Sequence, residues 1–135
     1  MLEGECLKEK GESKELKSLR ENVLTERLFR FTINVIKMLR KIKGGAELLI
    51  IKTQLIKSAS SSGANYEEAQ GAVSRADFGN KVGISLKEMR ESNYWLKILR
   101  ELFPENAEIE TQFKESIELK NILGSIHSKV SKRIK

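Results

Sequence analysis

The chain has 135 residues, a length typical of one domain. Hydrophobic residues make up 39% and charged residues 33%, with 25 Lys and Arg against 19 Asp and Glu, so the net charge is +6. This composition excludes a disordered tail protein and a disulfide-stapled miniprotein. The longest apolar run, Leu48 to Ile51, is far shorter than the roughly 20 residues that cross a bilayer. Because Cys6 is the single cysteine, no intramolecular disulfide can form, and we expect a cytoplasmic protein without a membrane partner.

Glycine and proline divide the chain into four segments. Gly44 and Gly45 predict a turn, small residues gather at 58–63, and Pro104 is compatible only with a helix start or a loop. The segments between these breaks are 22–43, 46–69, 74–103 and 106–133. Leucine is abundant, with 16 residues beside 5 Val and 4 Thr, which favours helices.

Two segments carry more apolar surface than a small monomeric bundle needs. In 22–43, apolar residues recur at spacings of 4 and 3 from Leu24 to Ile42. A second stripe beside it consists of Phe29, Ile33, Ile36 and Leu39. In 74–103, a second stripe consists of Ile84, Glu88, Glu91, Trp95, Ile98 and Leu102. Since a helix packed into one bundle needs a single stripe, we expect the extra faces to form contacts between subunits.

Three local patterns predict helix ends and a close helix contact. Ser74 precedes Asp77 by three residues, as in a capping box, and Asn106 is a suitable N-cap for the last helix. Ser58 and Ser62 lie on the inner face of the second segment, where small side chains allow a neighbouring helix to approach. The sequence therefore predicts an all-α, up-down-up-down four-helix bundle.

The bundle is expected to form one domain over residues 22–135. It follows a charged extension, residues 1–21, with few apolar positions. Two interpretations of this extension remain open: it is flexible, or it continues the first helix.

Three motifs follow one another between residues 58 and 96. The first comprises Gly63, Ala64, Asn65, Glu68 and Ala69. The second comprises Ser74, Asp77, Phe78, Lys81, Ile84, Leu86, Lys87 and Glu88, and the third Glu91, Trp95 and Leu96. In this order they resemble the four helix bundle protein family, which includes proteins encoded in intervening sequences of bacterial 23S ribosomal RNA genes. Tyr66 and Ser85 replace the usual Ile and Ala at packing positions.

The resemblance implies a left-handed bundle that assembles into a homopentamer. The family is similar to the accessory variability determinant protein of retroelements, a basic pentamer that binds RNA and a reverse transcriptase. The implied partners are thus further copies of the chain, RNA or DNA, and a reverse transcriptase or another protein. The family motif implies packing or interface roles for Asn65, Glu68, Phe78, Glu88, Glu91 and Trp95.

The side chains offer little for catalysis, so we expect no enzyme and no cofactor. His127 is the sole histidine, and Gly124 stands where a Glu-x-x-His metal motif needs its carboxylate, so no metal site is expected. The pair Glu88 and Glu91 leaves two interpretations, a divalent cation site or a polar contact across a helix interface. The second is favoured, with Arg90, Lys87 or Asn65 as partners. Trp95 is expected to anchor the core or an interface, and Tyr94 to be exposed.

Charge is concentrated at two places in the sequence. Segment 22–43 has a net charge of +5, segment 119–135 has five basic and no acidic residues, and segment 104–118 has a net charge of −4. Such clusters suit phosphate backbones. The residues expected to contact RNA or DNA are Arg27, Arg30, Lys37, Arg40, Lys41, Lys43, Lys129, Lys132 and Arg133. The alternative is an oligomeric scaffold that recruits a protein partner without binding nucleic acid.

Overall fold

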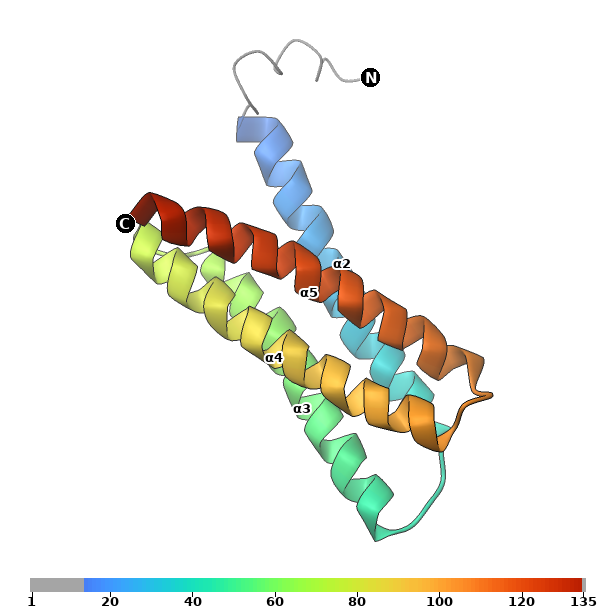
Figure 1. The fold of residues 1–135 in the computed structure, drawn as a ribbon. Coiled ribbons are helices and arrows are strands. Elements are labelled where there is room, and N and C mark those ends of the chain that lie inside the picture. Colours follow the sequence, from blue (N-terminus) through green and yellow to red (C-terminus); the bar gives the residue numbers. More distant parts are fainter. Residues whose placement is uncertain (1–13, 135) are drawn as a thin grey trace.

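The computed structural model describes residues 14–134, with the side chains of Glu15 and of residues 23–132. Every regular element in that part of the chain is an α-helix, and no strand occurs there. The helices drawn in Figure 1 are α2 (Lys14–Arg40), α3 (Ala46–Ala69), α4 (Arg75–Leu102) and α5 (Ala107–Ile134). The predicted all-α helical bundle is confirmed.

The bounds of α3, α4 and α5 agree with the predicted segments to within one residue at each end. The two predicted N-caps are present. The Ser74 hydroxyl accepts a hydrogen bond from the Asp77 amide (3.0 Å), and the Asn106 side-chain oxygen accepts one from the Ile109 amide (3.0 Å). Each bond satisfies an amide in the first turn that has no partner within its helix, which fixes where α4 and α5 begin.

The first helix is shifted toward the N-terminus relative to its predicted segment. It begins at Lys14, inside the predicted extension 1–21; Cys6 lies outside the described residues. At its other end, the Ile42 amide bonds to the Leu39 carbonyl (3.2 Å), a tight turn that leads into the glycine pair. The helix therefore stops a few residues earlier than the apolar periodicity predicts.

Each helix packs mainly against two neighbours, so the four helices close a ring. The pairs α3–α4 and α4–α5 are in the closest contact, and of these four contacts the one between α2 and α5 is the least extensive. In the first pair, Lys81 near the start of α4 reaches Glu68 near the end of α3 (3.4 Å), and Ser92 farther along α4 meets Ser58 (2.8 Å). These two helices thus run in opposite directions, and Figure 1 shows the chain reversing at each connection.

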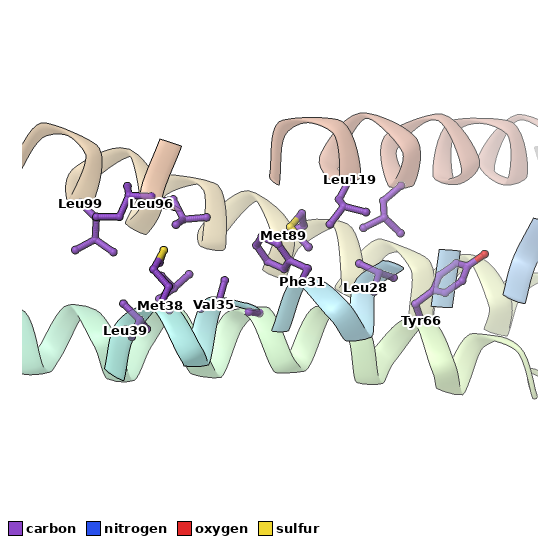
Figure 2. Close-up of a cluster of buried hydrophobic side chains, with 14 of the residues drawn as sticks. Leu28, Phe31, Val35, Met38, Leu39, Tyr66, Met89, Leu96, Leu99 and Leu119 are labelled. Atoms are coloured by element: carbon purple, nitrogen blue, oxygen red, sulfur yellow. The ribbon is translucent and has the colours of Figure 1, made fainter. Parts of the chain in front are cut away.

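A single apolar core runs along the axis of the bundle (Figure 2). From α2 it receives the predicted first stripe, including Phe31 and Val35. Leu39 is also part of it, with only 2% of its surface exposed, so its assignment to the second stripe is wrong. Leu39 follows Val35 by four residues, one helical turn, and therefore lies on the core face.

Four serines fill the contact between α3 and α4. The Ser62 hydroxyl donates to the Ser85 carbonyl (2.9 Å), and the Ser85 hydroxyl donates to the Ser62 carbonyl (2.7 Å). The Ser58 and Ser92 hydroxyls lie 2.8 Å apart, and all four residues are fully buried. Since these bonds reach from side chain to opposite backbone, the two helices lie close together, as the small residues of α3 predict.

Candidate nucleic-acid interface

Arg27, the first of the predicted basic residues, is held in an ion-pair network with α5. Its Nε lies 2.7 Å from Glu115 Oε2 and its Nη2 lies 2.8 Å from Glu115 Oε1, a bidentate geometry. Nη2 also donates to Glu118. The hydrogen bonds to Glu115 and then to Glu118 raise the pKa of the Arg27 guanidinium well above its ordinary value. Arg27 therefore joins α2 to α5 and leaves little charge for an outside anion.

Two further cations, Arg30 in α2 and Lys41 directly after its end, are paired, but at the surface. Arg30 Nε lies 3.0 Å from Glu26 one turn earlier on α2, and Lys41 Nζ lies 2.9 Å from Glu108 on α5. All four side chains are more than half exposed. Exposed pairs of this kind contribute little to stability and are screened by salt, so an incoming anion can replace the carboxylate at low energetic cost.

The remaining cations at the C-terminal end of α2 stay unneutralised. Lys37, Arg40 and Lys43 are exposed and form no ion pair with any residue in the described part of the chain. Together with Lys41 they surround the end of α2, and we refer to these four residues as the α2 basic end.

The second predicted cluster belongs to the last turns of α5. Lys129 and Lys132 are exposed, and neither has an ion pair within residues 23–132. Arg133 lies in α5, but its side chain is outside the described set. The Lys41–Glu108 pair places the α2 basic end beside the start of α5, whose 28 residues span about 42 Å. The two clusters therefore lie at opposite ends of the bundle (Figure 1).

The family-motif residues of α3 form short-range contacts. The Asn65 amide donates to the Ser61 carbonyl (2.9 Å) and hydroxyl (3.2 Å) within α3. Glu68 pairs with Lys81 across the α3–α4 contact, and Phe78 packs half-buried against the core. These contacts are consistent with packing roles.

The predicted cross-helix partners of the α4 carboxylates are wrong. Glu91 accepts a hydrogen bond from Trp95 Nε1 (3.2 Å), one turn farther along the same helix. Glu88 has no hydrogen bond or ion pair among the described side chains. Asn65 is absent from both contacts because its amide is engaged within α3. Within the same residues no group of three His, Cys, Asp or Glu is arranged to hold a metal ion.

The second stripe of α4 remains largely outside the core. Ile84 is 43% exposed and Leu102 53%, whereas Trp95 and Ile98 are half-buried against the core. Tyr94 is 57% exposed, as predicted, with its ring edge-on to Trp95. Ile84 and Leu102 are thus exposed apolar side chains of α4 in a single copy. None of the described helices has the length and apolar character needed to cross a membrane.

Sequence reasoning missed the charge pairing between α2 and α5. Arg27 and Glu115 are 88 positions apart, and no periodic pattern links residues so distant in sequence. The net charge of −4 over 104–118 was the available signal, since these acids needed basic neighbours from another helix.

This fold and these surfaces define a helical-bundle protein with exposed basic residues at both ends. The family model described as 23S rRNA-intervening sequence protein matches residues 20–125, so the chain belongs to that family. The predicted resemblance is confirmed.

A solved structure supports the same assignment. The chain is similar to a protein of unknown function from the S23 ribosomal protein family of Bacteroides thetaiotaomicron. The two are 31% identical, the match covers 80% of this chain and 97% of that one, and the TM-score is 0.71. No curated protein matches the sequence.

Proposed function

We propose that this chain is a non-enzymatic, cytoplasmic, homo-oligomeric four-helix bundle that binds RNA or DNA through its basic ends. The proposed particle is a homopentamer of up-down-up-down, left-handed bundles. The observation that carries the proposal is the α2 basic end, where Lys37, Arg40 and Lys43 keep their charge while the neighbouring Arg27 is neutralised. Positive charge concentrated at one end of the bundle suits a phosphate backbone. Next to it, the charges between α2 and α5 are largely neutralised by ion pairs.

Assembly strengthens this electrostatic argument. One chain has a net charge of +6, so five copies carry about +30. Contacts from lysine and arginine to phosphates position a strand without reading its sequence. The proposal is therefore for binding that is strong at low salt and weakly sequence-dependent.

Replacing the three unpaired cations of the α2 basic end tests the proposal directly. We expect the variant Lys37→Gln/Arg40→Gln/Lys43→Gln to bind single-stranded RNA more weakly. The slope of log Kd against the logarithm of the salt concentration should fall by about 2 if all three residues contact phosphates. Each contact to a single strand contributes roughly 0.7 to this slope. Fluorescence anisotropy of a labelled 20-nucleotide RNA between 50 and 300 mM salt measures both quantities.

The matched control removes the same charge elsewhere. Lys57, Lys87 and Arg90 are exposed on α3 and α4 and have no ion pair among the described residues. The variant Lys57→Gln/Lys87→Gln/Arg90→Gln should keep most of the slope. Equal losses of affinity in both variants would show that binding depends on net charge alone and not on the α2 basic end. RNA binding that is absent, or insensitive to salt, at low micromolar protein would refute the proposal.

The exposed apolar side chains of α4, Ile84 and Leu102, support the homo-oligomer. A glutamate at Ile84 would place a charge in a contact between copies, so we expect Ile84→Glu to lower the particle mass toward that of one chain. Val73, which is 91% exposed in the α3–α4 connection, provides the control Val73→Glu, which should leave the mass unchanged. Light scattering at matched concentrations distinguishes the two; a wild-type protein that is monomeric at high concentration contradicts this part of the proposal.

A second candidate function is an oligomeric scaffold that recruits a protein partner, such as a reverse transcriptase, without binding nucleic acid. It is favoured by the exposed apolar residues of α3, Leu49 (66% exposed) and Ile50 (61%), which lie outside the α4 face. A partner that is retained after nuclease treatment, together with no RNA binding in the anisotropy experiment, would favour this function over the first.

A further inference from the structure

Apolar side chains outside the core form one row on α2 and another on α4. The α2 row consists of Phe29, which is 52% exposed, and the half-buried Ile33 and Ile36. The α4 row is the second stripe of that helix, with Ile84 and Leu102 exposed. The rows lie on either side of α3, because α2 and α4 both pack against it. By contrast, no described residue of α5 is an exposed large apolar side chain.

The two rows carry opposite charges. The Arg30 guanidinium lies over the Phe29 ring (5.5 Å from Cζ to the centroid), and its exposed pair with Glu26 leaves most of its five N–H donors free. Glu88 follows Ile84 by one turn in the α4 row; it is half-buried and has no hydrogen bond or ion pair among the described residues. A carboxylate that has lost part of its hydration without gaining a cation is unfavourable.

Arg30 and Glu88 lie at nearly the same height along the bundle. Thr32 of α2 bonds to the Ala59 carbonyl of α3 (3.2 Å), and the adjacent Ser58 bonds to Ser92 of α4 (2.8 Å). Both α2 and α4 run antiparallel to α3, so they run in the same direction. Arg30 precedes Thr32 by two residues and Glu88 precedes Ser92 by four, so at 1.5 Å per residue their heights differ by no more than about 3 Å.

These charges decide which rows can meet when two copies associate. A two-fold axis places the same surface of each copy against the other. Such a contact between two α4 rows would oppose Glu88 with its own copy, and one between two α2 rows would oppose Arg30 with its own copy. The contact of an α2 row with an α4 row instead joins a cation to a carboxylate. Repeated by rotation, a contact between different surfaces closes into a ring.

We propose that the α2 row of one copy packs against the α4 row of the next, with Arg30 bonded to Glu88 of that next copy. Rotation about an axis parallel to the helices keeps every residue at its own height, so these two side chains meet across the contact. The inference rests on the proposed homo-oligomer and identifies the two surfaces that form it.

Exchanging the two charges tests the ion pair. In Arg30→Glu and in Glu88→Arg, like charges oppose each other across the contact, so we expect the protein concentration at half-dissociation to rise about tenfold or more. The double variant Arg30→Glu/Glu88→Arg restores an opposite-charge pair and should assemble like wild type. Arg90→Glu is the control, because Arg90 is exposed about 200° around α4 from Glu88 and should not alter assembly. Light scattering across a dilution series measures each midpoint.

Mixing two variants tests which rows meet. Phe29→Glu disables the α2 row and Ile84→Glu the α4 row, and both positions are exposed, so circular dichroism should show unchanged helix content. Each variant alone should have the mass of one chain at high concentration. An equimolar mixture should contain particles of two chains, because the intact α2 row of one variant meets the intact α4 row of the other and no third chain can add.

The outcomes separate this contact from the proposed function. A mixture that stays at the mass of one chain, or a Phe29→Glu variant that keeps the wild-type mass, would overturn the pairing of the two rows. A double charge variant as dissociated as the single ones would overturn the Arg30–Glu88 pair. A wild-type protein that is monomeric at high concentration would overturn the homo-oligomer itself, and the contact with it.

Discussion

Replacing Tyr66 with alanine is expected to lower the free energy of unfolding by about 3–5 kcal/mol, the range for deleting a large buried aromatic ring. Tyr66 is 1% exposed and is one of the largest fully buried side chains among the described residues. Figure 2 shows it at the same end of the core as Leu28, away from Leu99. Alanine would leave a cavity there, because the surrounding helices relax only partly around a deleted side chain.

Thermal and urea unfolding measure this loss, which corresponds to a fall in melting temperature of roughly 10–15 °C for a domain of this size. Tyr94→Ala is the matched control, because Tyr94 is 57% exposed and its replacement should change stability by less than about 0.5 kcal/mol. Equal effects of the two substitutions would contradict the burial of Tyr66 in the core.

Replacing Ser62 with leucine is expected to destabilise the bundle by about 2–4 kcal/mol. Ser62 is fully buried where α3 and α4 are joined by reciprocal hydrogen bonds with Ser85. A leucine at this position forces the helices apart, which costs about 1–3 kcal/mol or more, and it also removes a buried hydrogen bond worth about 1 kcal/mol. The expected result is a lower urea midpoint and a lower melting temperature.

Ser60→Leu separates this steric effect from the change in residue type. Ser60 is exposed on α3, and its hydroxyl bonds only to carbonyls of its own helix. Its replacement should alter stability by no more than about 0.5 kcal/mol. If Ser62→Leu unfolded at the same urea concentration as Ser60→Leu, the close approach of α3 and α4 would be refuted.

Much of the fold follows from local sequence. The bounds of three helices were predicted to within one residue, since the caps at Ser74 and Asn106 and the breaks at glycine act on neighbouring residues. The packing roles of Tyr66 and Ser85 are confirmed, because both are buried. Leu39 was misassigned because a stripe drawn at spacings of 3 and 4 does not settle where the core face ends.

The candidate site was predicted only in part. The sequence located the basic clusters, because clusters in sequence remain clusters on a helix. It did not identify which of these cations are paired, because Arg27 and Lys41 meet carboxylates of another helix.

The sequence by itself determined the four helices, their core faces and the family, because helix periodicity, capping and motifs are properties of neighbouring residues. Only the tertiary structure decided which cations remain available to a ligand. Arg27 is neutralised by a glutamate 88 positions away, and Lys41 is paired with one 67 positions away, while Lys37 and Arg40 are exposed and have no ion pair among the described residues. Ion pairs depend on distances in space, and the packing of α2 against α5 sets those distances.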